Sequence, residues 1–267
     1  MTRQSGQNHE FDYATHWISR QVESGFLGFD TGPLLTGVLK FGTIWNLTSL
    51  AYLATSWSKI TTPFLLASAI GQVWINISPY LIWYYDERVM PEFFTKFTDI
   101  YEDNDQLASI AKRYNEFYAN YDIRIAILWV GLLWLGGWAG RPVLLAQGMD
   151  VFGGIFVYLS FAWAAYIGII LAEPGFKGPV TTILLMREMA DLEFEIQPLH
   201  PDQLGGLSTV GYFSIRTTLL FSTASLFLPL AFEFAAGSGG EVLVTIVVAT
   251  YILTVLASFV YPTYKIN

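Results

Sequence analysis

The stretch Pro63–Tyr85, PFLLASAIGQVWINISPYLIWYY, contains no charged residue. A helix needs about 20 mostly apolar residues to cross the hydrocarbon core of a bilayer, so this stretch predicts a transmembrane helix. The whole chain agrees, because 53% of its residues are hydrophobic and only 13% are charged, whereas soluble domains are about 25% charged. This composition argues against an ordinary soluble enzyme, and the lack of cysteine excludes disulfide scaffolds and cysteine-ligated metal centres.

Five further segments are long and apolar enough to be spans, which brings the expected number to six. We therefore expect an all-α, polytopic membrane protein. Its expected transmembrane helices cover residues 33–56, 63–85, 123–140, 151–172, 211–236 and 242–261.

Basic residues set the expected orientation of these spans. Six spans place both termini and the long loops 86–122 and 173–210 on one side of the membrane. That side carries nine lysine and arginine residues, whereas the other side carries only Lys59 and Arg141. Cytoplasmic loops are enriched in lysine and arginine, so we expect a cell-membrane protein with both termini in the cytoplasm.

The segments outside the spans are expected to form a cytoplasmic helical layer. Apolar residues recur at helical spacing near the N-terminus, which predicts an amphipathic helix on the membrane surface or on the protein's own loops. The same spacing predicts a helical hairpin, or extensions of spans, before residue 123 and an amphipathic helix after residue 172. The chain is thus divided into cytoplasmic segments 1–32, 86–122 and 173–210 and membrane segments 33–85, 123–172 and 211–267.

The acidic balance of the chain, with a net charge of −8, has two interpretations. An acidic surface keeps a protein hydrated and dispersed at high salt, which fits a halophilic archaeon as the source. Ordinary acidic loops would produce the same balance. The sequence contains no basic patch, so nucleic-acid binding is disfavoured.

Polar side chains share one face of several expected spans. Such side chains either hydrogen-bond neighbouring helices or line a water-filled path through the membrane. The charged ones lie near a membrane face, where snorkelling or interfacial pairing is the alternative to a place in a permeation path. The candidates for that path are Lys40, Asn46, Gln72, Asn76, Arg216, Ser222 and Glu233.

The segment Pro198–Leu207, PLHPDQLGGL, leads into the fifth expected span. It resembles a His-Pro-Asp-x-x-Gly-Gly-Leu segment that precedes a transmembrane helix in uncharacterised prokaryotic multi-pass membrane proteins. This resemblance implies no activity. Proline and paired glycines are typical of a structural elbow, and the alternative is a ligand or gating site. The candidate residues there are His200, Asp202, Gly205 and Gly206.

The sequence lacks the nucleotide-binding, metalloprotease and nucleophile-elbow motifs of common enzymes. Its three histidines do not support a metal or haem site, so we expect no cofactor and no metal and lean against an enzyme. The leading hypothesis is a homo-oligomeric channel or channel-like permeation protein in the lipid bilayer. The alternative is a membrane sensor or scaffold that signals to a cytoplasmic protein partner. A third is a lipid-active enzyme with His200 and Asp202 as its acid and base.

Overall fold

The computed structural model describes residues 11, 13–98, 101, 103–192 and 208–236, together with single positions between 242 and 256. Every regular secondary-structure element in these residues is a helix. The described residues also contain an isolated β-bridge between Phe26 and Phe29. The all-α fold class is therefore confirmed for the described part of the chain.

Three helices in the described residues are long and apolar enough to cross a membrane. The first joins α4 (Thr62–Tyr84), η3 (Tyr85–Val89) and α5 (Met90–Phe97). The second joins α9 (Val151–Tyr166), η5 (Ile167–Ala172) and α10 (Glu173–Met189). The third joins α11 (Ser208–Ser222), η6 (Thr223–Phe227) and α12 (Leu228–Ala236). A fourth candidate, bent by 42°, is the pair α6 (Asn104–Ala119) and α7 (Ile123–Ala139).

This number of three to four candidate spans is smaller than the expected six. The first expected span forms one helix from α2 (Pro33–Gly37), η1 (Val38–Gly42) and α3 (Thr43–Ser56), but that helix is not among those that are both long and apolar enough. The sixth, 242–261, lies mostly outside the described residues. Two of the helices, of 36 and 39 residues, exceed the length of about 20 residues that a bilayer needs, so each extends beyond the hydrocarbon core.

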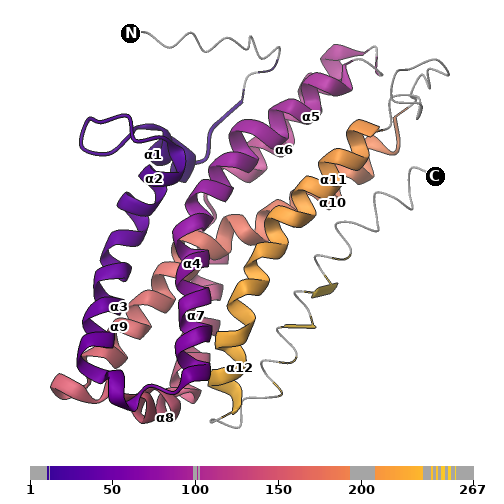
Figure 1. Cartoon of the computed structure of the whole chain (residues 1–267). Coiled ribbons are helices and arrows are strands. Elements are labelled where there is room, and N and C mark those ends of the chain that lie inside the picture. Colours follow the sequence, from indigo (N-terminus) through magenta and orange to yellow (C-terminus); the bar gives the residue numbers. More distant parts are fainter. Residues whose placement is uncertain are drawn as a thin grey trace.

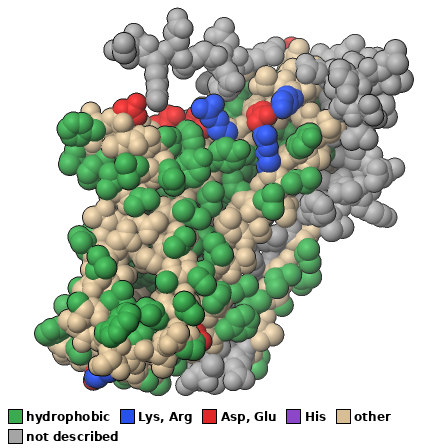
Figure 2. Space-filling model, viewed as in Figure 1, with side chains coloured by type: hydrophobic (Ala, Val, Ile, Leu, Met, Phe, Trp, Pro, Cys, Tyr) green, Lys and Arg blue, Asp and Glu red, His purple; other side chains and the backbone are tan. Residues whose placement is uncertain are grey.

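The helices lie side by side in an elongated bundle with two distinct ends (Figure 1). One end, which we call the charged end, holds α1 (Trp17–Glu23), α5, α6 and the start of α11. The other end holds η2 (Trp57–Lys59), α8 (Arg141–Leu144), η4 (Leu145–Met149) and α12. On the visible face, charged side chains gather at the charged end, whereas apolar side chains cover the middle (Figure 2).

Large apolar side chains point outward along the middle of the bundle. Ile44 and Leu47 on α3, and Ile127, Leu135 and Trp138 on α7, are each more than 60% exposed. Contiguous exposed apolar surface of this kind marks contact with lipid or with another protein. The described helices are thus compatible with a membrane protein.

A cluster of aromatic rings forms the core at the charged end. The ring of Phe93 lies 4.3 Å from that of Phe213, and the ring of Tyr85 lies 4.8 Å from Tyr118 and 5.1 Å from Phe221. Buried methionines of α10 complete this cluster. Helices α5, α6, α10 and the first part of α11 therefore pack into one unit, which we call the end bundle.

Candidate functional site

Buried polar side chains gather where the end bundle meets the apolar helices. Five of them, which we call the junction cluster, come from four separate segments of the chain. They are each at most 3% exposed and comprise His16 before α1, Asp86 in η3, Tyr118 in α6, and Glu173 and Lys177 in α10. Burying charged groups is costly unless they are paired and hydrogen-bonded, so the contacts of each member matter.

Glu173 is the best-connected member of the cluster. Its Oε1 lies 2.9 Å from Lys177 Nζ and accepts a hydrogen bond from the backbone N–H of Asp122 at 3.1 Å, while its Oε2 lies 3.6 Å from His16 Nε2. Burial acts to raise the pKa of the Glu173 carboxyl, but His16, Lys177 and the Asp122 N–H together hold it below its ordinary value. Lys177 also donates to the carbonyl of Asn120. This ion pair therefore ties α10 to the bend between α6 and α7.

Asp86 is the second carboxylate of the cluster, and it directly follows the uncharged stretch that ends at Tyr85. Its Oδ2 accepts the backbone N–H of His16 at 2.7 Å, whereas its Oδ1 is buried without a hydrogen-bond partner among the described residues. Burial raises the pKa of Asp86 to about 7, although the His16 N–H and the Ser19 hydroxyl act to lower it. A carboxyl group with this pKa gains or loses its proton near neutral pH.

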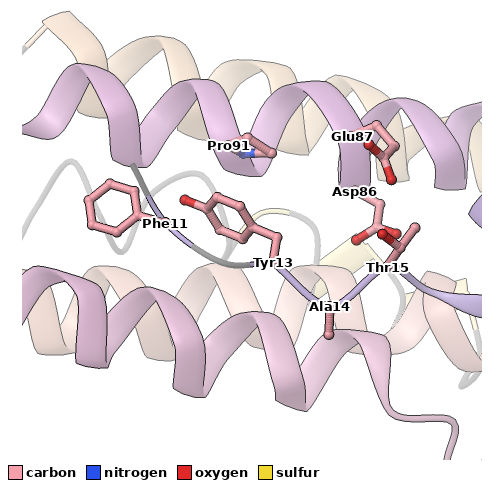
Figure 3. Close-up of a pocket in the computed structure, with 7 residues that line it drawn as sticks. All are labelled: Phe11, Tyr13, Ala14, Thr15, Asp86, Glu87 and Pro91. Atoms are coloured by element: carbon pink, nitrogen blue, oxygen red, sulfur yellow. The ribbon is translucent and has the colours of Figure 1, made fainter. Parts of the chain in front are cut away.

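An extended segment, residues 13–16, connects the helix that carries Asp86 to α6 at this point. This segment, which we call the strap, runs between η3–α5 and α6 (Figure 3). The backbone N–H of Ala14 donates to Asn115 Oδ1 at 2.7 Å, in addition to the bond from His16 to Asp86. The strap thus links α6 to η3 through two buried side-chain acceptors.

A cavity of about 230 Å³ lies between the strap and η3–α5. Figure 3 shows Asp86 and Glu87 extending from η3 toward the strap at this cavity. The remaining lining is aromatic or apolar apart from one threonine. The lining residues are Phe11, Tyr13, Ala14, Thr15, Asp86, Glu87 and Pro91.

Asp86→Asn is expected to remove a pH dependence of stability. Because the pKa of Asp86 is higher in the fold than its ordinary value near 4, its contribution to stability is fully present below about pH 4 and is lost as the pH rises to about 7. Asparagine retains the acceptor for His16. As the pH rises from about 4 to about 7, the free energy of unfolding of the wild type should therefore fall by on the order of 2–4 kcal/mol relative to that of Asp86→Asn.

Denaturation followed by tryptophan fluorescence at about pH 5 and pH 8 measures this difference. Titrating groups that do not interact with Asp86 contribute equally to both proteins, so their contributions cancel. An equal stability difference at the two pH values would show that Asp86 does not titrate in this range.

Three of the sequence-predicted path residues meet in one hydrogen-bonded group, which we call the amide network. Gln72 Nε2 and Asn76 Nδ2 donate to Asn46 Oδ1 at 2.7 and 2.9 Å, and Asn46 Nδ2 donates to Asn76 Oδ1 at 2.9 Å. Gly42 permits this approach, because a Cβ there would lie 2.1 Å from Asn76 Oδ1. The network joins helix 33–56 to α4 near the middle of both, and its members satisfy one another.

The other predicted path residues do not join this network. Lys40 Nζ donates to the Gln21 carbonyl at 2.8 Å and to Ser24 Oγ at 2.6 Å, at the C-terminal end of α1. Arg216 pairs with Glu92 on α5, and Ser222 donates to the carbonyl of Leu219 in its own helix. Glu233 is half-buried on α12. The elbow candidates His200, Asp202, Gly205 and Gly206 lie outside the described residues.

Sequence reasoning missed the junction cluster. One local signal was present, because Glu173 and Lys177 are four residues apart, immediately after an apolar run, and so share one helical face. No local signal connects them to His16 or Asp86, which are more than 80 residues away in sequence. In the described part of the chain, no group of three or more histidine, cysteine, aspartate or glutamate residues is arranged to hold a metal ion.

Comparison of the chain with family models, with curated proteins and with solved structures found no match.

Proposed function

We propose that this chain is a six-span membrane protein that acts as a sensor or scaffold, transmitting a conformational signal between its spans and a cytoplasmic protein partner. The observation that carries this proposal is the continuity of its helices. Helices 62–97, 151–189 and 208–234 each run from the apolar middle into the end bundle. Two of these helices pass through the π-helical segments η3 and η5, which are sites where helices commonly bend. The chain nevertheless stays helical there, so a shift or tilt of one of these spans would be carried into its part of the end bundle.

The distribution of charge supports six spans with both termini in the cytoplasm. The end bundle and the adjoining η3 carry the described basic residues of loops 86–122 and 173–210, whereas Lys59 and Arg141 lie at the opposite end. An excess of lysine and arginine marks the cytoplasmic side. The end bundle would then be the cytoplasmic layer. Helix 33–56 and segment 242–261 would supply the spans beyond the candidates described above.

The junction cluster supports the coupling role. Its ion pair holds α10 against the bend between α6 and α7, and the strap holds η3 against α6. Two of the continuous helices and the bent pair are thereby linked at one buried point. Movement of one span would reach the others there rather than being absorbed by a flexible loop.

Spin labels on the end bundle test this proposal, and the absence of native cysteine makes labelling specific. Thr95→Cys on α5 and Ser109→Cys on α6 are exposed positions. Lipids of different chain length change the tilt of spans through hydrophobic mismatch. We expect the distance between the two labels to change by several ångströms between short-chain and long-chain bilayers.

The matched control for this experiment carries Glu173→Gln and Lys177→Met, which remove both charges of the buried pair. This double variant should show a smaller change in the label distance, because α10 is no longer held at the bend. A label distance that is the same in all bilayers would contradict transmission from the spans to the end bundle.

A homo-oligomeric channel is the second candidate function, and the amide network favours it. The three amides lie near mid-helix, where polar groups are costly in lipid, and they are only half-buried within one chain. A second copy against helix 33–56 and α4 would enclose them in a polar passage. The amides of one chain already bond one another, so they leave no passage inside a single subunit. The passage would therefore lie between two subunits.

Ion flux through liposomes that contain the purified protein tests the channel. If it conducts, Asn76→Leu should lower the flux severalfold, whereas Thr55→Val at the exposed end of α3 should leave it unchanged. Liposomes that show no flux under any salt, pH or voltage would exclude this function. They would leave the label-distance experiment to decide the first proposal.

A further inference from the structure

We propose that the cavity beside the strap is a binding site for a small protonated amine, with Asp86 and Glu87 as its charged contacts. This role as a ligand input rests on the proposed sensor function, but the binding itself does not.

Two neighbouring cations act electrostatically on the carboxylates of the cavity from a distance, Arg20 on Asp86 and Arg88 on Glu87. Neither Asp86 nor Glu87 forms an ion pair among the described residues. Arg20, the nearest basic residue on α1, donates to the Thr15 carbonyl. Arg88 lies over the ring of Trp83, with its Cζ 5.9 Å from the ring centroid. Both carboxyl groups therefore lack a direct ion pair among the described residues, and a ligand cation could supply one.

Asp86 supplies the observation that points to a hydrogen-bond donor. Its side chain is 3% exposed, and its Oδ1 makes no hydrogen bond of normal geometry in the described residues, although the Ser19 hydroxyl lies near the carboxyl group. A buried acceptor without a partner costs about 1–3 kcal/mol, and more when it is charged. A ligand N–H directed at Asp86 from the cavity would remove that cost.

The rest of the lining favours an organic cation over a metal ion. Ca²⁺ needs six to eight oxygen ligands and Mg²⁺ usually retains several waters, whereas the cavity offers two carboxylates beside Phe11, Tyr13, Ala14 and Pro91. Aromatic rings and apolar side chains suit the carbon atoms that flank an ammonium group. At about 230 Å³, the cavity has room for an alkylammonium ion of a few carbon atoms.

A bound amine would contact both the strap and η3. It would therefore strengthen the attachment of the strap to the helix that continues from α4. Through the strap, which also binds Asn115, the ligand would act on α6. The cavity is thus placed where a small molecule can change the coupling between the spans and the end bundle.

Isothermal titration calorimetry of the full-length protein in detergent tests this site. The probe is ethylammonium chloride, which is titrated into the protein. A second titration with the same concentration of sodium chloride serves as the reference at equal ionic strength. We expect Asp86→Asn to weaken binding about tenfold and Glu87→Gln to weaken it severalfold, as the loss of a charged hydrogen bond predicts. Asp150→Asn, at the opposite end beside Lys59, should bind like the wild type.

A second probe separates the hydrogen bond from simple charge attraction. Tetramethylammonium has the same charge but no N–H group, so it should bind more weakly than ethylammonium. Equal affinity for the two probes, or equal affinity in the wild type and in both cavity variants, would overturn the proposal, as would the absence of ethylammonium binding to folded protein.

Glu87→Gln keeps the test decisive if Asp86→Asn fails to fold, because Glu87 is only half-buried. The outcome also separates this proposal from the sensor function. Calorimetry detects the amine whether or not the end bundle moves, and the label distance responds to bilayer thickness whether or not an amine binds.

Discussion

Replacing Lys177 by methionine is expected to lower the free energy of unfolding by about 3–5 kcal/mol, the cost of leaving one member of a buried ion pair without its partner. Glu173 would remain fully buried, with its Oε1 no longer beside the ammonium group 2.9 Å away. The loss should also loosen the bend between α6 and α7, since Lys177 donates to the Asn120 carbonyl. Chemical denaturation in detergent, followed by tryptophan fluorescence, measures the change.

Two control variants test whether the loss of stability comes from an unpaired buried charge. Lys112→Met breaks an exposed pair with Glu116 and should cost less than about 1 kcal/mol. The double variant Glu173→Gln, Lys177→Met leaves no unpaired buried charge and should recover much of the loss. If Lys177→Met costs no more than Lys112→Met, the buried pair does not hold the junction.

Gly168→Ala is expected to lower the free energy of unfolding, because η5 and α7 approach each other closely at Gly168. A Cβ at residue 168 would lie 2.8 Å from the backbone nitrogen and 3.0 Å from the Cα of Val130. A rotamer change cannot relieve a clash with backbone, so the two helices must separate. Overpacking of this kind costs about 1–3 kcal/mol and occasionally more.

Gly136→Ala and Gly175→Ala are the matched controls, because a Cβ at either position meets nothing within 4 Å. Both glycines are helical, so alanine should be neutral or slightly stabilising. The same denaturation measurement applies to all three variants. A Gly168→Ala protein as stable as these controls would show that η5 and α7 do not pack closely.

The positions of the apolar helices could be predicted from the sequence, because they depend on the hydrophobicity of neighbouring residues along the chain. The stretch Pro63–Tyr85 corresponds to α4 within a residue or two, since an uncharged run of this length has one stable state in lipid. The number of spans was harder to predict, because helices such as 62–97 continue beyond the apolar stretch into the end bundle. Composition alone does not show where a continuous helix leaves the membrane.

The amide network was partly predictable, whereas the junction cluster was not. Gln72 and Asn76 are four residues apart on one helix, so their shared face is visible in the sequence. Their pairing with Asn46 depends on the packing of two helices. From the sequence, hydrogen bonds between helices were one of two alternatives for these polar side chains. The junction cluster joins His16, Asp86 and Glu173 across long stretches of chain, and no local pattern records such contacts.

The sequence by itself determined that this protein is helical and apolar and that its charges lie in particular segments, because these properties depend on neighbours along the chain. Only the tertiary structure decided which charged side chains are buried together. Asp86 and Glu173 look like ordinary carboxylates at the ends of apolar runs, but packing removes both from water. Glu173 is thereby brought against Lys177, and Asp86 against the cavity beside the strap. Each carboxyl group keeps one oxygen, Glu173 Oε2 or Asp86 Oδ1, without a hydrogen-bond partner in the described residues. The cost of burying a charge depends on what surrounds it in space, and only the fold determines that.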